Sequence, residues 1–187
     1  GIAEGHAVTY ASGLSASGIL PVIALYSTFS QRAYDNIIHD FLLQDLPFVL
    51  CLDRGGLVGE DGPTHHGVLD IAMFIAMPNI IISAPKDGNE LRDLFHTALN
   101  LKKGFVIRYP KGSSVSFVSG QKGKILDIGK WEILKKGKKV TILAIGSAVD
   151  IISKDYDVIS REIGFRPTLV NARFIKPLDR DMLNNLF

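Results

Sequence analysis

Residues that transfer protons or bind anions recur through the first 111 positions of this sequence: Glu4, Tyr26, Arg32, Arg54, Asp61, His65 and Lys111. Histidine and carboxylate side chains act as general acids and bases, and arginine and lysine bind carboxylates or phosphates. Three of them lie in the stretch Asp53–Gly67, which reads DRGGLVGEDGPTHHG. This stretch is longer than a turn requires and is dense in glycine and ionisable groups. We therefore interpret it as a ligand-binding loop rather than as a solvated surface turn.

Other kinds of chemistry find less support in the sequence. There is no Gly-x-Ser-x-Gly motif and no Walker loop, and Cys51 falls inside an apolar strand, where a buried structural thiol is expected. The run Glu60-Asp61-Gly62 with Asn89 imitates a diphosphate–Mg²⁺ motif, but it lacks a glycine directly before the aspartate. Adjacent histidines rarely share one ion, so no metal ligands are predicted within this sequence.

Composition places the chain among ordinary globular proteins. Its 187 residues are 47% hydrophobic and 21% charged, with a net charge of +2 and dispersed basic residues, so no nucleic-acid partner is expected. The basic cluster 135–139 is interpreted as a solvated turn. The sequence contains no apolar run of membrane-spanning length and no signal-peptide pattern, so we expect no membrane association and a cytoplasmic location. The chain starts at Gly1 and stops within a helical pattern at Phe187, and we expect it to be part of a longer protein.

The elements that must position these residues alternate between helices and strands. Apolar spacing predicts helices over 4–17, 29–44, 68–76 and 89–102. Ser27 and Thr28 are expected to cap the second of these helices. Strands are predicted over 21–26, 48–52, 80–83 and 105–109. Such alternation predicts an α/β fold, with a parallel sheet flanked by helices and right-handed crossovers. The candidate residues follow strand ends or lie in adjacent loops, where ligands of α/β proteins bind.

A second, partial α/β domain is predicted after a change in composition. The segment 111–124 is rich in Gly, Ser and Lys, and we assign a linker to 116–124, between a first domain at 1–115 and a second at 125–187. In the second domain the pattern predicts strands over 140–145 and 167–170, a helix over 148–163 and a last helix that begins near 177.

Three long motifs closely resemble the 1-deoxy-D-xylulose-5-phosphate synthase family of the thiamine-diphosphate transketolase superfamily. They are Gly-Ile-Ala-Glu-Gly-His-Ala-Val at 1–8, Tyr-Ser-Thr-Phe-Ser-Gln-Arg-Ala-Tyr-Asp at 26–35, and the loop at 53–67. Arg-Tyr-Pro-Lys-Gly at 108–112 and Asn-Ala-Arg-Phe-Ile-Lys-Pro-Leu-Asp at 171–179 extend the match. The resemblance implies a pyrimidine-binding domain followed by the first part of a C-terminal domain. The family's diphosphate and Mg²⁺ ligands belong to a preceding domain that this sequence does not include.

The resemblance also implies roles for single residues. Glu4 matches the catalytic glutamate that bonds to the pyrimidine ring of thiamine diphosphate and promotes its imino form, and Phe29 matches the residue that stacks on that ring. The substrate-binding positions implied are Tyr26, Arg32, Arg54, Asp61, His65 and Lys111, and His65 is also expected to be catalytic.

The reaction implied joins pyruvate to glyceraldehyde 3-phosphate with loss of CO2, in isoprenoid precursor synthesis, by a homodimer. Two departures from the family pattern stand out: Gly5 replaces a usual Gln, and Lys111 replaces a usual Arg. Lysine meets a phosphate as a point charge, without the bidentate geometry of arginine, so phosphate binding is expected to be less tight. Three alternatives remain: the β-subunit of a 2-oxo-acid dehydrogenase, which has the same layout, a non-catalytic α/β ligand-binding module, and a purely structural fragment.

Overall fold

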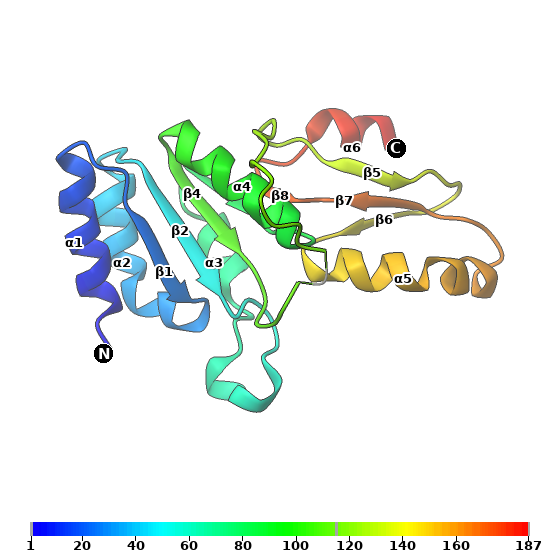
Figure 1. The fold of residues 1–187 in the computed structure, drawn as a ribbon, viewed down its shortest axis with the longest axis horizontal. Helices are drawn as coiled ribbons and strands as arrows, with labels where there is room; N and C mark the ends of the chain where they lie inside the picture. Colours follow the sequence, from blue (N-terminus) through cyan, green and yellow to red (C-terminus); the bar gives the residue numbers. More distant parts are fainter. Residues whose placement is uncertain (1, 115, 187) are drawn as a thin grey trace.

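The computed structural model describes residues 2–114 and 116–186 and contains two sheets (Figure 1). The larger sheet has the strand order β1-β2-β4-β3-β8. Its first four strands are parallel, as predicted, and span Val22–Tyr26 (β1), Phe48–Asp53 (β2), Gly104–Arg108 (β4) and Ile80–Ser83 (β3). The fifth strand, β8 (Phe174–Lys176), comes from the second half of the chain and pairs antiparallel with β3. The sequence did not predict this strand, because three residues are too few to show an alternating pattern.

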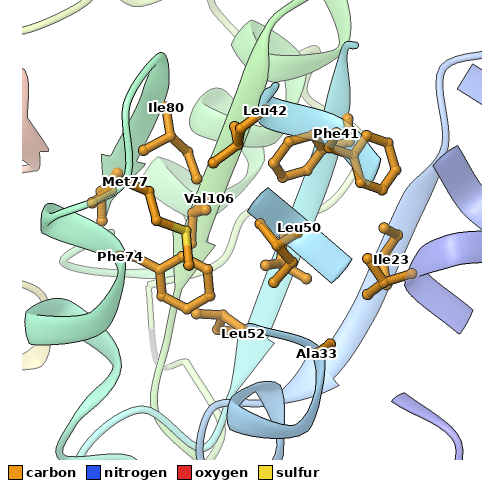
Figure 2. Packing of buried hydrophobic residues seen from close by; sticks show 14 of the residues in the cluster. Ile23, Ala33, Phe41, Leu42, Leu50, Leu52, Phe74, Met77, Ile80 and Val106 are labelled. Atoms are coloured by element: carbon orange, nitrogen blue, oxygen red, sulfur yellow. The ribbon is translucent and has the colours of Figure 1, made fainter. Parts of the chain in front are cut away.

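Helices cover both faces of the larger sheet. One face packs against α1 (Glu4–Ala16), the helical segment that follows β1, and α3 (Asp70–Ile75); the core there includes Phe41, Leu50 and Phe74 (Figure 2). The other face packs against α4 (Gly88–Leu101). The apolar cluster on this face continues to residues of α6 (Arg180–Leu186), which lies beside the second sheet (Figure 1). Strand β2 is fully buried apart from its last residue, which explains its continuous apolar run. Within the described residues, no helix is long and apolar enough to cross a membrane.

The segment predicted as one helix over 29–44 is helical but irregular. It comprises a 3₁₀ helix η1 (Thr28–Ala33), a single turn α2 (Tyr34–Asn36) and a π-helical stretch η2 (Ile37–Leu42). The predicted cap at Ser27 is wrong, because Ser27 has helical backbone angles and its side chain makes no capping bond. Its backbone N–H instead donates to the Asp53 carbonyl oxygen at 2.7 Å, which fixes the end of β1 against the end of β2.

The second sheet has the order β5-β7-β6, with β5 at Glu132–Lys135, β6 at Thr141–Ala144 and β7 at Thr168–Asn171. Helix α5 (Ser147–Glu162) packs on it through Val149 and Tyr156. The sequence analysis missed β5, which pairs antiparallel with β7. The predicted turn at 135–139 is confirmed, since it joins β5 to β6 and its lysines are exposed.

The segment between β4 and β5 has neither helix nor strand in its described residues, 109–114 and 116–131. It is nevertheless held against α4. The Val118 backbone N–H donates to Asn89, and the Arg92 guanidinium donates to the Val118 carbonyl. Further on, the Leu126 backbone N–H donates to the Thr97 hydroxyl at 2.9 Å. The segment therefore follows the helix surface rather than spanning open solvent.

Candidate functional site

The carboxyl ends of β1, β2 and β4 lie side by side, and the candidate residues gather beyond them. Tyr26 ends β1, Arg54 follows β2, and Lys111 lies three residues after β4. Figure 1 shows the loop between β2 and α3 extending past these strand ends. In this loop Asp61 bonds to Arg54 and the ring of His65 lies near that of Tyr26. The expectation that strand ends bring the site residues together is confirmed, whereas their chemical roles stay predictions.

Aromatic rings form the centre of the group. The Phe29 ring stacks on Tyr26 with centroids 5.5 Å apart, and the His65 ring meets Phe29 edge-on at 5.2 Å. The guanidinium of Arg32 lies 4.6 Å from the Phe29 ring centroid, and that of Arg54 lies 3.8 Å from the Tyr26 centroid. A flat ligand that stacked on Phe29 would have to share the ring with these neighbours or displace one of them.

Glu4 connects to this group through Arg32, whose Nη1 donates to Glu4 Oε1 at 3.1 Å. Glu4 is the first residue of α1, and its side chain is 11% exposed. Its second oxygen, Oε2, is buried and has no hydrogen-bond partner among the described residues. Burying a carboxylate oxygen without a hydrogen-bond partner costs free energy. A bound ligand that donates a hydrogen bond to Oε2 would offset this cost. A pyrimidine ring with a protonatable nitrogen fits this oxygen and the nearby Phe29.

Charged groups form the other end of the site. Asp61 accepts from Arg54 Nε at 3.0 Å and from Lys111 Nζ at 2.6 Å, and Arg54 also pairs with Asp53. The hydrogen bonds from Lys111 and Arg54 lower the pKa of Asp61, which is therefore a carboxylate at neutral pH. All eight residues singled out by the sequence thus belong to one chain of contacts, from Glu4 at one end to Lys111 at the other.

The two adjacent histidines of the loop have different tasks. The His65 ring faces Phe29 and Tyr26, and its Nδ1 is 3.0 Å from the hydroxyl of Thr64. The Nδ1 of His66 instead accepts the backbone N–H of Val58 at 3.2 Å, which ties the two sides of the loop together. Only His65 is placed to meet a ligand.

A cavity of about 270 Å³ lies between the loop after β4 and the first turns of α4 and α5. Of the candidate residues only Lys111 lines it, alongside Lys86, Ser114 and Lys154. Each of the three lysines pairs with a carboxylate, so the cavity offers little free positive charge. The described residues contain no cluster of three or more His, Cys, Asp or Glu side chains that could hold a metal ion.

The sequence analysis missed several residues that shape the site. Arg108 is half-buried against the base of the loop and pairs with the buried Asp70 of α3. The hydroxyl of Ser27 is buried beside Gly67 and has no partner among the described residues. The expected burial of Cys51 is confirmed, and burial raises the pKa of its thiol to about 11, so it is no nucleophile at neutral pH.

Comparison with known proteins agrees with this arrangement. Residues 1–115 match the model of the transketolase pyrimidine-binding domain, and residues 129–187 match that of the transketolase C-terminal domain. A solved structure described as "split gene transketolase, inactive beta4 tetramer", where beta4 refers to its subunits, superposes with a TM-score of 0.84. The two chains are 25% identical, and the superposition covers 98% of this chain and 59% of that one. A transketolase from Campylobacter jejuni gives 0.72, also at 25% identity, over 90% of this chain and 27% of that one.

Curated relatives are more similar in sequence. The 1-deoxy-D-xylulose-5-phosphate synthase of Dictyoglomus thermophilum is 54% identical over 96% of this chain, and that of Syntrophus aciditrophicus is 51% identical over 98%. The synthase of Aquifex aeolicus is 49% identical over 100%. The chain spans only 29%, 28% and 29% of the lengths of these three relatives. From the family-model matches and the shared fold, the chain belongs to the transketolase family, with its pyrimidine-binding domain first and C-terminal-domain sequence after it.

Proposed function

We propose that this chain forms the pyrimidine-binding part and some of the C-terminal part of a 1-deoxy-D-xylulose-5-phosphate synthase. The enzyme would join pyruvate to glyceraldehyde 3-phosphate with loss of CO2. The observation that carries the proposal is the buried Oε2 of Glu4, which has no hydrogen-bond partner among the described residues. The other oxygen of Glu4 bonds to Arg32, which lies over the ring of Phe29. The curated relatives, near 50% identity over almost the whole chain, support it.

Further parts of the proposal concern the whole protein. We divide the chain into a pyrimidine-binding domain at 1–115, a linker at 116–124 and part of a C-terminal domain at 125–187. The diphosphate and Mg²⁺ ligands would come from a domain outside this chain, and the enzyme would act as a cytoplasmic homodimer. These points follow from the resemblance to the synthase family.

When bound, thiamine diphosphate supplies the electron sink for the pair of electrons left by loss of CO2. In this chain Glu4 would hold a proton at Oε2 toward the pyrimidine ring, and Phe29 would orient that ring by stacking. Because Arg32 neutralises Oε1 and remains 44% exposed, it can keep the carboxylate in place and still move to admit a ligand. His65 lies next to Phe29 and would exchange protons with substrate hydroxyl and carbonyl groups.

The substrate phosphate would be held at the charged end of the site. Arg54 and Lys111 are the cations there, and both already engage the carboxylate of Asp61. A phosphate must therefore share these cations with Asp61 or replace it. Glyceraldehyde 3-phosphate carries both a phosphate and a hydroxyl, so Asp61 can accept from the hydroxyl while the cations meet the phosphate.

The test is Glu4→Gln in the full-length protein that carries this chain, at saturating cofactor. Glutamine keeps the size of the side chain and an oxygen for Arg32, but it cannot transfer a proton. Turnover should fall by about 10²–10⁴-fold, the usual effect of losing a general acid or base. The matched control is Glu162→Gln, the same change at an exposed residue of α5, which should leave turnover unchanged.

Calorimetry with thiamine diphosphate and Mg²⁺ separates binding from chemistry, because the variant should still bind when the diphosphate is held elsewhere. Retention by Glu4→Gln of more than about a tenth of the wild-type turnover, outside the usual range for such groups, would contradict the assignment.

A further inference from the structure

Arg108 is a charged residue at the end of the buried strand β4. It is not one of the eight residues that the sequence singled out for the site. Its side chain is 16% exposed, and its Nε donates to Asp70 Oδ2 at 2.7 Å. Asp70, the first residue of α3, is itself only 2% exposed. Removing two charges from water costs free energy, which offsets most of the attraction between Arg108 and Asp70. Because the pair adds little net stability, we asked which neighbouring groups it holds in place.

The guanidinium of Arg108 lies against both ends of the loop between β2 and α3, where the loop leaves and rejoins the sheet. The backbone groups of Gly56 and Gly67 exchange two hydrogen bonds, at 2.7 and 2.8 Å, and so form a closed neck from which the loop extends. Arg108 Nη2 approaches the Gly67 carbonyl oxygen at 3.4 Å. On the other side, a Cβ atom added to Gly55 would lie 2.9 Å from Arg108 Cζ, so only glycine lets the backbone approach the guanidinium this closely.

The neck matters because of what it carries. The chain between Gly56 and Gly67, which includes Asp61 and His65, leaves and rejoins the sheet through this neck. Displacement of a positioned group by about 1 Å can cost about 10²-fold in rate, so a loose neck would impair the site without touching a ligand-binding residue.

We propose that Arg108, held by Asp70, is a positioning residue that fixes the neck of the Gly56–Gly67 loop and thereby places His65 and Asp61 against the substrate. The part that concerns the substrate rests on the proposed synthase function. The part that concerns the loop does not, and this difference lets the two be tested separately.

The main variant combines Arg108→Gln with Asp70→Asn in the full-length protein, so that no unpaired charge is left buried. Glu60 is exposed in the loop, so cleavage after it by a Glu-specific protease, followed by mass spectrometry, reports how often the loop opens. Cleavage at Glu60 should accelerate at least about tenfold, and kcat/KM for the condensation should fall by about 10–100-fold. Arg108→Lys keeps a cation for Asp70 but not the second contact, and it should lie between this variant and wild type.

The control is Arg92→Gln on α4, where the arginine is 18% exposed and pairs with Asp93 away from the loop. It should leave both readouts unchanged. A second variant, Gly55→Ala, tests the contact from the other side, since its methyl group would push the guanidinium off the neck. It should accelerate cleavage at Glu60 in the wild-type background and add little in the double variant, because the two changes disturb the same contact.

Unchanged cleavage in both the double variant and Gly55→Ala would overturn the proposal. So would faster cleavage in an enzyme that retains its full kcat/KM, because the neck would then not position the site. If the wild-type protein lacked the condensation activity, the function proposed above would fail, and the cleavage assay would still decide the role of Arg108 at the neck.

Discussion

Replacing Gly67 with alanine should damage the site through the addition of one methyl group. The Cβ of such an alanine would lie 2.5 Å from the Ser27 Cβ and would also overlap the Ser27 hydroxyl and the Arg54 carbonyl oxygen. Ordinary contact begins at 3.4 Å, so Gly67 must move away from Ser27 by at least about 0.9 Å. The Arg54 carbonyl belongs to the backbone and cannot rotate away as a side chain can, so the neck itself must open.

The expected cost has two parts. Forcing a methyl group into a filled position typically costs about 1–3 kcal/mol of stability. A shift of nearly 1 Å at the neck would also displace Arg54 on one side and His65 on the other, for which about a 10²-fold loss of kcat/KM is expected. Urea denaturation and steady-state kinetics on the full-length protein measure the two parts separately.

Gly13→Ala is the matched control, because it is the same substitution in α1 at a position where a Cβ would meet nothing within 4 Å. It should stabilise the protein by about 0.5–1 kcal/mol, as alanine does in a helix, and leave turnover unchanged. Adding Ser27→Ala to Gly67→Ala should restore only part of the loss, since the clash with the Arg54 carbonyl remains. If Gly67→Ala kept wild-type stability and kcat/KM, the geometry of the neck would be refuted.

Two further predictions follow from the charged groups. Lys111→Ala should raise the KM for glyceraldehyde 3-phosphate by roughly tenfold or more, as expected for a lost charged contact, with little change in the KM for pyruvate; an unchanged KM would mean that Lys111 does not meet the phosphate. Glu90 lies in α4, and its burial raises its pKa above the usual 4.5. The protonated carboxyl group therefore contributes stability below pH 4.5, and this contribution is lost as the pH rises through the folded-state pKa. Glu90→Gln removes this loss, so urea denaturation from pH 4.5 upward should show the variant gaining stability relative to wild type, by at most about 1.4 kcal/mol per pH unit; a difference that does not change with pH would contradict it.

The sequence predicted the placement of the site better than the details that support it. Tyr26, Arg54 and Lys111 could be expected to meet, because the ends of neighbouring parallel strands lie at one edge of a sheet. Arg108 was missed because its partner Asp70 is 38 residues away, and sequence spacing does not show which way a strand-end side chain turns. The cap predicted at Ser27 failed because the backbone of that residue bonds to Asp53 of the next strand, a tertiary contact that overrides local preference.

Strand β8 has a consequence for where the chain can be divided. It covers the outer edge of β3 by pairing Phe174 with Ser83 and Lys176 with Ile82, and Trp131 donates its indole N–H to the Phe174 carbonyl at 2.8 Å. A polypeptide that ended at residue 115, where the match to the first family domain ends, would keep the pairing of β3 with β4 but lose β8 from the outer edge of β3. Exposed strand edges of this kind attract strands from other molecules, and aggregation follows. We therefore do not expect the boundary between the two family domains to divide the chain into independently soluble units.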